Sequence, residues 1–450
     1  MNLNEFKKSV YNRNVSVIGL GISNRPLIKY LVKLGANVVG YDRRTKEQLG
    51  EIYDELSGLG VRLVLGESYL DNLTGEIIFK TPGLRFDHPA LLAAKENGSV
   101  ITSEMEVFFD ICPANIIAVT GSDGKTTTTT LIHKVMTAAG YKTWLGGNIG
   151  NPLLTDAENM KPTDWVILEL SSFQLHTMKK SPKIAVITNL SPNHLDVHKD
   201  YQEYIDAKKN IMLYQNDSDK LVVNKSNAET EKIGKEAKGI CVDFSSKEKA
   251  HVYLQDGTIF RDTKPVLDIS DIKIPGMHNV ENYMAAIAAV EGLASDDVIK
   301  NVAKTFGGVE HRIELVRVLD GVRYYNSSID SSPNRTINTL KVFPEKVIMI
   351  AGGKDKGIPY DELGMPLCEK VKLLILIGKT ADKIEEAVKN AGGKDIEILR
   401  CETFEQVVKT AYERAVSGDV VLLSPASTSF DMFANFEERG NLFKKLVNEL

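Results

Sequence analysis

The segment 115–130, NIIAVTGSDGKTTTTT, constrains this chain more than any other stretch. An apolar, β-branched run leads into a glycine-containing turn, and Lys125, Thr126 and a helix-compatible segment follow at once. This order is typical of a phosphate-binding loop, in which backbone N–H groups and a helix N-terminus converge on an anion. The lysine would reach the terminal phosphates, and the threonine hydroxyl would ligate the accompanying Mg²⁺. Val119 replaces the usual first glycine, which indicates a shortened loop; a plain turn with a solvated lysine is the alternative.

Length and alternation of patterns predict the fold class. The 450 residues exceed what one hydrophobic core serves and suggest about three domains. Short apolar runs alternate with helical patterns, which predicts an α/β protein with mainly parallel sheets. The expected strands fall into three clusters, and we place domains at 1–100, 101–308 and 309–450. The expected strands are 15–20, 37–41, 76–80, 115–120, 164–170, 183–189, 220–224, 347–350, 372–377, 396–400 and 419–423.

Charge and cysteine usage exclude several classes of protein. The net charge of −5 gives no general basic field for nucleic acid or a membrane surface. The four cysteines form no CxxC pair, which argues against a disulfide framework and a zinc site. The first residues lack the apolar segment of a signal peptide, and no run approaches the roughly 18 apolar residues of a membrane span. We therefore expect a cytoplasmic protein.

A second glycine-containing turn follows the strand at 15–20. Its sequence, GLGISN, matches a dinucleotide fingerprint except that Asn24 replaces the third glycine, and Asp42 comes about 20 residues later. The turn either binds a diphosphate, with Asp42 and Arg43 at the crevice edge, or is only a tight strand-to-helix connection. Because one of the two loops has a GKT lysine and the other does not, we expect one nucleotide that reacts and one that only anchors a substrate to the protein.

Three further residues in the middle of the chain are candidates for a metal site. Glu169 lies at the carboxyl end of a strand and offers the oxygen donors that Mg²⁺ prefers, or it is a solvated acid. His194 lies in the loop NLSPNHLDVH, and Lys208 follows in a helical pattern. A buried Lys208 could take up CO₂ as a carbamate and supply anionic oxygens, whereas an exposed helical lysine would not.

Asn279, Asn282 and Arg312 are candidates for nucleotide contacts. The two asparagines are one helical turn apart and could read an adenine edge or cap the helix. The arginine could clamp a transferring phosphoryl group or form an ordinary surface ion pair. Three polar loops follow strands of the last domain, with the sequences YYNSSIDSSPNRT, GGKDKG and LLSPASTSFDMFANFEERG. We expect ligand contacts in these loops.

Taken together and in this order, these segments resemble the Mur ligase family, which assembles the peptide stem of bacterial cell-wall precursors. The matching pieces are TGSDGKTT, GGNIGNP, LELSSFQL, the NLSPNHLDVH loop with Lys208, GMHNVENYMAA, HRIE, GGKDKG and SPASTSFDMFANFEERG. The resemblance implies an ATP-dependent amide ligase that adds D-glutamate to UDP-N-acetylmuramoyl-L-alanine through an acyl phosphate. It implies a Rossmann-like first domain for the uridine diphosphate, a central P-loop ATPase-type domain, and a Rossmann-like last domain that closes over ATP and the amino acid.

The resemblance also implies cofactors and site residues. It implies two Mg²⁺ ions, a carbamylated Lys208, a monomer, and no nucleic-acid or membrane partner. Lys125, Lys208, His194 and Arg312 would serve catalysis. ATP would contact Gly121, Ser122, Asp123, Gly124, Lys125, Thr126, Thr127, Asn279, Asn282 and Arg312; the metal ions would contact Thr126, Glu169, His194 and Lys208. The UDP substrate would contact Gly21, Ile22, Ser23, Asp42, Arg43, Gly83 and Asn148, and the amino acid Ser331, Lys356, Ser429 and Phe436.

One segment departs from the family pattern. The common NDSKATN is NSSIDSS here, with Ser327 in place of the aspartate and Ile329 in place of the lysine. Asp330, Ser331 or Arg335 could compensate. The alternatives are a sibling ligase for another amino acid, a folylpolyglutamate synthase, or a P-loop ATPase without ligase chemistry. A dehydrogenase would leave the GKT loop unexplained.

Overall fold

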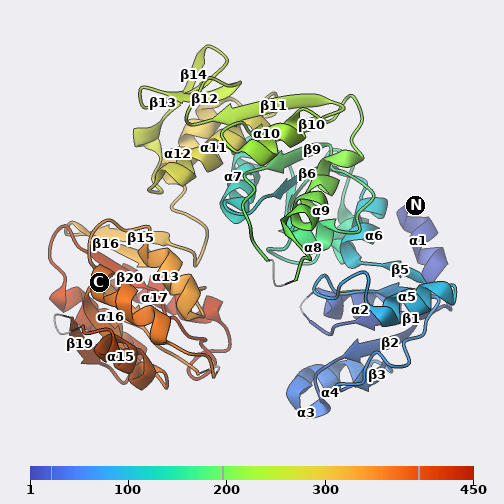
Figure 1. Cartoon of the computed structure of the whole chain (residues 1–450), viewed down its shortest axis with the longest axis horizontal. Helices are drawn as coiled ribbons and strands as arrows, with labels where there is room; N and C mark the ends of the chain where they lie inside the picture. Colours follow the sequence, from blue (N-terminus) through green and yellow to red (C-terminus); the bar gives the residue numbers. More distant parts are fainter. Residues whose placement is uncertain (22, 195–196, 356, 394–395) are drawn as a thin grey trace. The chain divides into compact units, whose positions relative to one another are not determined.

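The computed structural model describes all residues except 22, 195–196, 356 and 394–395. The chain folds into two compact units (Figure 1). The first contains Met1–Ile272 and Met277–Lys304, and the second contains Lys273–Gly276 and Thr305–Leu450. Two of the three sheets belong to the first unit and one belongs to the second.

The first sheet is fully parallel, with the strand order β3-β2-β1-β4-β5. Its central strand is buried after its first residue, which explains the apolar run in the sequence. The strands are β1 (Asn14–Ile18), β2 (Asn37–Asp42), β3 (Arg62–Leu65), β4 (Ile77–Phe79) and β5 (Val100–Thr102). The helices are α1 (Leu3–Val10), α2 (Asn24–Lys33), α3 (Lys46–Leu49), α4 (Glu51–Gly58), α5 (Pro89–Glu96) and α6 (Glu104–Ile111).

The second sheet has the order β14-β13-β12-β11-β10-β9-β6-β8-β7 and carries an antiparallel β12–β14 meander at one edge. Its other pairings are parallel. The strands are β6 (Asn115–Thr120), β7 (Thr143–Gly147), β8 (Trp165–Glu169), β9 (Ile184–Ile187), β10 (Lys220–Asn224), β11 (Ile240–Ser245), β12 (Val252–Gln255), β13 (Thr258–Arg261) and β14 (Lys264–Asp268). The helices are α7 (Lys125–Ala138), η1 (Leu154–Asn159), α8 (Ser172–Leu175), α9 (Tyr201–Leu213), α10 (Ala228–Gly234), η2 (Ile269–Asp271), α11 (Met277–Ala289) and α12 (Asp296–Thr305).

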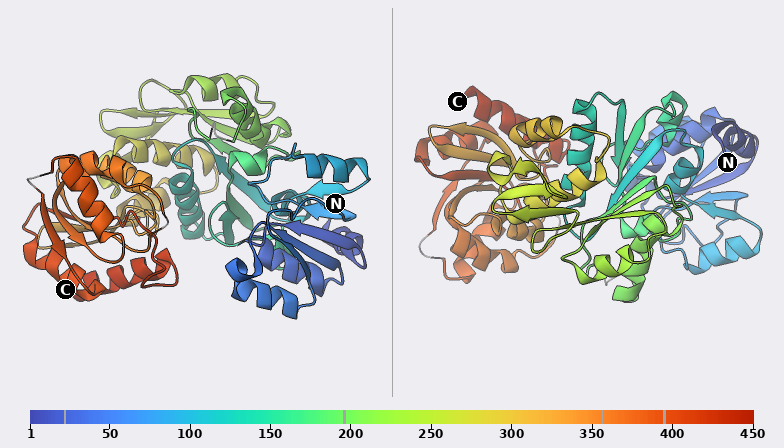
Figure 2. Two further views of the ribbon diagram at one scale, coloured as in Figure 1. Left: turned by 60° about the horizontal axis from the view of Figure 1, so that its bottom comes forward. Right: turned by 90° about the horizontal axis from the view of Figure 1, so that it is seen from above.

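The third sheet has the order β15-β16-β20-β17-β18-β19, parallel except for the β15–β16 hairpin. One apolar cluster packs α14 and α15 on one face, and another packs α16 and α17 on the opposite face (Figure 2). The strands are β15 (Glu314–Leu319), β16 (Val322–Asn326), β17 (Val347–Ala351), β18 (Val371–Leu376), β19 (Glu397–Arg400) and β20 (Val420–Leu423). The helices are α13 (Pro333–Leu340), η3 (Asp361–Leu363), α14 (Gly364–Lys370), α15 (Ala381–Asn390), α16 (Phe404–Arg414) and α17 (Phe436–Glu449). The predicted α/β class with mainly parallel sheets is confirmed.

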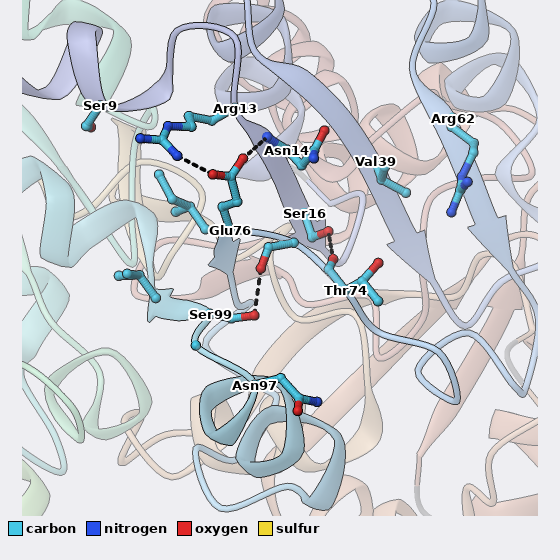
Figure 3. Close-up of a pocket in the computed structure, with 14 residues that line it drawn as sticks. Ser9, Arg13, Asn14, Ser16, Val39, Arg62, Thr74, Glu76, Asn97 and Ser99 are labelled. Atoms are coloured by element: carbon cyan, nitrogen blue, oxygen red, sulfur yellow. Dashed lines mark hydrogen bonds and ion pairs between the residues drawn. The ribbon is translucent and has the colours of Figure 1, made fainter.

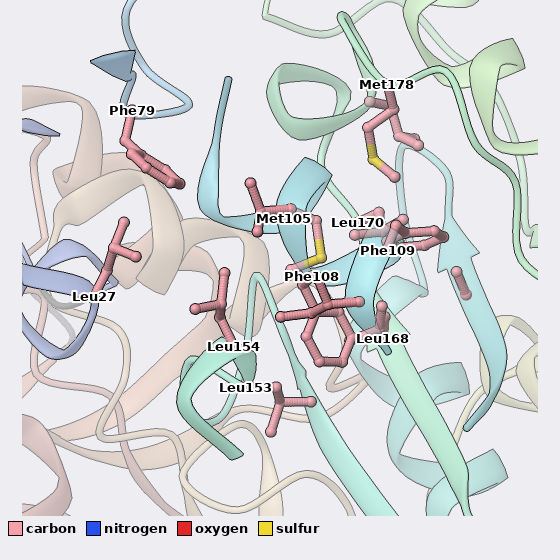
Figure 4. Close-up of a cluster of buried hydrophobic side chains, with 14 of the residues drawn as sticks. Leu27, Phe79, Met105, Phe108, Phe109, Leu153, Leu154, Leu168, Leu170 and Met178 are labelled. Carbon is pink, nitrogen blue, oxygen red and sulfur yellow. The ribbon is translucent and has the colours of Figure 1, made fainter. Parts of the chain in front are cut away.

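A continuous core joins the first two sheets. Phe108 of α6 belongs to the same buried cluster as Phe79 of β4 and Leu168 of β8 (Figure 4). Burial of each such side chain stabilises the fold by about 1.5–3 kcal/mol. The first two sheets therefore share apolar contacts through α6.

Two further observations concern the surface. A cavity of about 710 Å³ lies at the amino ends of β1 and β4, lined by Arg13, Arg62, Glu76 and Ser99 among others (Figure 3). None of the described residues predicted to bind substrate lines it. Across the part of the chain that the structure describes, every helix is too short or too polar to cross a bilayer.

Candidate active site

The loop after β6 depends on two glycines with positive φ angles. Gly121 has φ +149°, and a Cβ there would lie 2.0 Å from the Thr188 hydroxyl oxygen. Gly124 has φ +77° and precedes α7; a Cβ there would lie 2.2 Å from Asn282 Oδ1. Any side chain at either position would clash, so the backbone can pass close to its neighbours only with glycine. The N-terminus of α7 is thereby directed at the end of the loop.

The lysine of the loop folds back over it. Lys125 Nζ donates to the carbonyl oxygens of Gly121 at 3.0 Å and Ser122 at 2.9 Å. The Ser122 hydroxyl donates to Ser191 O at 3.0 Å, which ties the loop to the segment after β9. Asp123 donates its N–H to Asn189 Oδ1 at 2.9 Å, and Thr127 is half-buried in the first turn of α7. The loop is therefore held in place by its neighbours, and its ammonium group lies over it.

Glu169 ends β8, the strand beside β6, and is 2 % exposed. Its Oε2 accepts the Thr126 hydroxyl at 2.6 Å, and its Oε1 accepts the Asn148 amide at 2.7 Å. Both of these donors are uncharged side-chain groups. A buried carboxylate beside a hydroxyl is a donor set that suits Mg²⁺, and it places three predicted site residues together.

Lys208 of α9 is 2 % exposed, which excludes the exposed-lysine alternative. Its Nζ donates to Gly121 O at 2.8 Å, the same carbonyl oxygen that Lys125 contacts, and to Thr120 Oγ1 at 3.2 Å. Burial, and then the nearby charge of Lys125, hold the pKa of Lys208 well below its ordinary value. The neutral amine, which is the form that reacts with CO₂, is thereby favoured.

His194 and the two asparagines also lie around this loop. His194 has φ +55°, and its ring packs edge-on against Phe173 at 5.2 Å between centroids. Asn282 accepts the Thr128 hydroxyl at 3.2 Å and donates to Asn279 Oδ1 at 3.2 Å. Asn282 therefore contacts α7 directly, through which α11 is positioned against the loop.

In the first sheet, both carboxylate oxygens of Asp42, at the end of β2, accept hydrogen bonds. Asp42 Oδ2 accepts the Leu20 N–H at 2.7 Å and Arg44 Nη2 at 2.7 Å, and its Oδ1 accepts Arg44 Nε at 2.9 Å. The hydrogen bonds from Arg44 and Leu20 outweigh burial and lower the pKa of Asp42. Asn24 donates to the carbonyl oxygens of Ile18 and Gly19, at 2.9 and 3.0 Å. The asparagine that replaces the third glycine thus fastens the turn.

Apart from Asn148, which follows β7, the other described residues predicted to bind the sugar nucleotide lie around that turn, after β2 or after β4. Gly21 and Gly83 have open space where a Cβ would stand. Ser23 precedes α2 and makes no side-chain cap hydrogen bond. Arg43 is exposed and pairs with Glu67 at 2.8 Å. Ile22 lies outside the described residues.

The described residues of the second unit that were predicted to bind ligands lie at the carboxyl end of its parallel strands. Ser331 donates to Ile329 O at 3.3 Å, and Ser429 is buried. Phe436 begins α17, and its carbonyl oxygen accepts the Ser328 hydroxyl at 2.8 Å. Arg312 pairs with Val309 in an isolated antiparallel β-bridge. Lys356 lies outside the described residues.

Arg439 is a buried residue of this unit that sequence reasoning missed. Its guanidinium donates to Ser328 Oγ at 3.0 Å, Ser328 O at 2.8 Å and Ser427 O at 3.1 Å. Burial lowers its pKa to about 10. Asp330, in the segment that departs from the family pattern, is also buried and accepts the Ser424 hydroxyl at 2.8 Å. The serine-rich departure is thus part of an internal polar network.

Comparison with known proteins covers the whole chain. The family model for the Mur ligase MurD-like N-terminal domain matches residues 13–103, the Mur ligase middle domain matches 119–290, and the Mur ligase glutamate ligase domain matches 311–427. Proteins called UDP-N-acetylmuramoylalanine–D-glutamate ligase from Acetivibrio thermocellus and Ruminiclostridium cellulolyticum are each 56 % identical, covering 100 % of this chain and 99 % of theirs. The one from Clostridium novyi is 52 % identical, with 99 % of each chain covered.

Solved structures are similar in fold. The crystal structure of the UDP-N-acetylmuramate-alanine ligase from Thermotoga maritima has a TM-score of 0.58 and 20 % identity, covering 97 % of this chain and 99 % of that one. A UDP-N-acetylmuramoyl-L-alanyl-D-glutamate–2,6-diaminopimelate ligase has a TM-score of 0.55 and 18 % identity, with 86 % of each chain covered.

Proposed function

This chain belongs to the Mur ligase family, and we propose that it is the ligase that joins D-glutamate to UDP-N-acetylmuramoyl-L-alanine with ATP, in peptidoglycan precursor synthesis. The observation that carries this proposal is the 56 % identity, over the full chain, to proteins that bear that ligase name. The loop geometry supports it, because the α7 N-terminus, Lys125 and Thr126 lie where a triphosphate would be held.

The reaction would proceed through an acyl phosphate. The γ-phosphoryl group would pass to the L-alanine carboxylate, so that a phosphorus–oxygen bond to that carboxylate forms as the bond to ADP breaks. The D-glutamate amine would then attack the acyl carbon, lose its proton and expel phosphate. Phosphoryl transfer needs positioning and charge neutralisation, which Lys125 and Arg312 would provide. Bound Mg²⁺ would screen the phosphate charges.

The metal ions would be held by oxygen donors around Glu169. We propose Thr126 for the first ion, and Glu169, His194 and a carbamylated Lys208 for the second. The burial of Lys208 and its lowered pKa support the carbamate, because both favour the neutral amine that reacts with CO₂, and the product would be an anion that can bind metal. His194 would position substrate rather than act as the base.

The sugar nucleotide would be held at the first sheet, and the amino acid at the third. We propose that the turn at 19–23 and Gly83 bind the uridine diphosphate mainly through backbone groups, because Asp42 is already paired with Arg44. Arg43 and Asn148 would contribute side chains. We also propose that Ile22 contacts the sugar nucleotide. D-Glutamate would contact Ser331, Lys356, Ser429 and Phe436. The protein would be a cytoplasmic monomer with domains at 1–100, 101–308 and 309–450.

A phosphate-release assay with a panel of amino acids tests this function. With ATP, Mg²⁺ and UDP-N-acetylmuramoyl-L-alanine present, D-glutamate should stimulate release about 10²-fold more than L-glutamate, L-alanine or L-lysine. Stimulation by another amino acid instead would identify a sibling ligase. Equal release without the sugar nucleotide would identify an ATPase without ligase chemistry.

The carbamate has its own test. Lys208→Ala should lose activity about 10²-fold, because the metal loses an anionic ligand, and added short-chain carboxylic acids should restore part of it. Lys209→Ala, at the neighbouring and more exposed lysine of α9, is the control. Full activity of Lys208→Ala would remove Lys208 from the metal site.

A further inference from the structure

Arg85 lies two residues after Gly83, in the loop that follows β4, and uses all of its N–H donors. An arginine has five. Its Nε and Nη2 donate to Asp87 at 2.9 and 2.8 Å, within the same loop. Nη2 and Nη1 donate to the two carboxylate oxygens of Glu203 at 2.9 and 3.1 Å, and Nη1 also donates to Val197 O at 2.6 Å. The guanidinium thus joins two carboxylates and a carbonyl.

In the sequence, the two distant partners of Arg85 lie between His194 and Lys208, two residues of the proposed metal site. The N–H of Val197, the residue whose carbonyl oxygen accepts from Arg85, donates to His194 O at 3.1 Å. Glu203 lies in the first turn of α9, the helix that carries Lys208. One side chain of the loop after β4 therefore contacts both a residue that is hydrogen-bonded to His194 and the first turn of the Lys208 helix.

Aromatic contacts make a second connection between the same elements. Phe86 packs edge-on against His176, with ring centroids 4.6 Å apart. His176 lies 5.4 Å from His198, which stacks on Phe173 at 5.3 Å. Phe173 in turn contacts His194. A continuous row of rings thus runs from the residue after Arg85 to the proposed metal ligand.

The hydrogen bonds of Arg85 exclude two other roles for the residues around it, metal binding and phosphate binding. His176, His198 and Glu203 are close enough together to hold a metal ion, but the guanidinium already occupies both oxygens of Glu203. Hydrogen bonds from Arg85 lower the pKa of Asp87 and of Glu203 to about 2, so both stay ionised near neutral pH. With every donor engaged, Arg85 is also not available for a substrate phosphate.

We propose that Arg85 is a positioning residue that couples binding of the sugar nucleotide at the Gly83 loop to binding of metal at His194. This inference rests on the proposed function, because it takes the occupants of the two loops from it. The coupling is reciprocal: sugar nucleotide tightens metal binding, and metal tightens sugar-nucleotide binding by the same factor. Lysine cannot replace Arg85, because a single ammonium cannot bind two carboxylates bidentately and a carbonyl.

The test measures binding, not turnover. Mn²⁺ affinity for the full chain with ADP is measured by electron paramagnetic resonance, with and without UDP-N-acetylmuramoyl-L-alanine. In the wild type the sugar nucleotide should tighten Mn²⁺ binding about 10-fold. In Arg85→Lys the factor should fall to about one, while Mn²⁺ affinity without sugar nucleotide changes less than about threefold.

Two variants separate coupling from general stability. Arg25→Lys alters an ion pair between α2 and Glu55 that does not reach the second sheet, and it should keep the wild-type factor. Glu203→Gln removes the negative charge that Arg85 contacts on α9, with little change of side-chain shape, and should reduce the factor by which sugar nucleotide tightens Mn²⁺ binding. This second variant tests the proposal even if Arg85→Lys does not fold. No coupling in the wild type, a retained factor in Arg85→Lys, or equal loss in Arg25→Lys overturns the inference. Failure of the proposed function would show instead as no binding of the sugar nucleotide.

Discussion

Asp42 and Glu169 occupy equivalent places in two different sheets. Each ends a strand that lies beside the strand feeding a glycine-containing loop, β2 beside β1 and β8 beside β6. Asp42 is neutralised by the Arg44 guanidinium, whereas the described donors to Glu169, a hydroxyl and an amide, are uncharged. Topology therefore decides where such a carboxylate lies, and its neighbours decide whether it fastens a loop or remains available to a cation.

The side chains that donate to the loop carbonyl oxygens also differ between the two regions. The loop after β6 has two lysines, Lys125 and Lys208, on one carbonyl oxygen. At the corresponding turn of the first sheet, Asn24 donates to carbonyl oxygens instead. We infer that the second loop carries the chemistry and that the first only binds, and the following predictions test this contrast.

The largest effect is expected from Lys125→Ala. The variant loses the charge that would stabilise the transferring phosphoryl group, so phosphate release with all substrates present should fall about 10³-fold. Lys134→Ala, at an exposed lysine of the same helix α7, is the matched control and should retain activity. Turnover within tenfold of the wild type in Lys125→Ala would mean that the second loop is not the reactive one.

Glu169→Gln should come next. The amide keeps the size of the side chain but removes the anionic oxygen, so kcat should fall about 10²-fold and the Mg²⁺ concentration for half-maximal rate should rise. The measurement is a Mg²⁺ titration of the steady-state rate. An unchanged Mg²⁺ requirement would remove Glu169 from the metal site.

Asp42→Asn should change binding without changing catalysis. It weakens the charged hydrogen bonds to Leu20 and Arg44, each worth about 1.5–3 kcal/mol, and loosens the turn that we propose as the sugar-nucleotide site. KM for UDP-N-acetylmuramoyl-L-alanine should rise about tenfold, with kcat within about twofold. If instead the variant acquired the altered Mg²⁺ dependence expected of Glu169→Gln, the contrast between the two carboxylates would be lost.

The smallest effect concerns a third buried carboxylate. Burial raises the pKa of Glu104, in the first turn of α6, to about 7. As pH rises from about 4.5 to about 7, the Glu104 side chain loses its proton in the unfolded chain but keeps it in the folded protein. The free energy of unfolding therefore falls as pH rises through this range. The protein should be about 1 kcal/mol less stable at pH 8 than at pH 6 because of this group.

Chemical denaturation at both pH values measures this difference. Glu104→Gln should remove it, since the amide does not titrate. The exposed Glu96→Gln should leave it unchanged. A pH dependence that survives in Glu104→Gln would assign it to other groups.

The sequence predicted the buried parallel strands well and the hairpins poorly. Apolar runs such as 115–120 identify a strand that is buried on both faces, and the structure confirms it as β6. The predicted strands omitted β12–β14 and the β15–β16 pair, and also the partly exposed parallel strands β3, β5, β7 and β11. Both hairpins contain an Asp-Gly turn with positive φ angles, at 256–257 and 320–321, and that dipeptide between alternating residues was the available signal.

For the site, sequence reasoning identified residue types but not their surroundings. The GKT loop and Glu169 follow from local pattern, because a strand end fixes their place. The burial of Lys208 depends on how α9 packs, and the pairing of Asp42 with Arg44 depends on a side-chain rotamer. Arg85 was missed because two of its three partner residues, Val197 and Glu203, are more than 100 positions away. Such contacts carry no local signature.

The shared core around α6 has a consequence for how relatives of this chain could exchange parts. Phe108 and Phe109 complete a core to which both the first and the second sheet contribute. In a chimaera that took the first sheet from another ligase but kept its own α6, the side chains of α6 would pack poorly against those of the new sheet. Recombination between such enzymes should therefore succeed more often when α6 and both of the first two sheets come from the same parent.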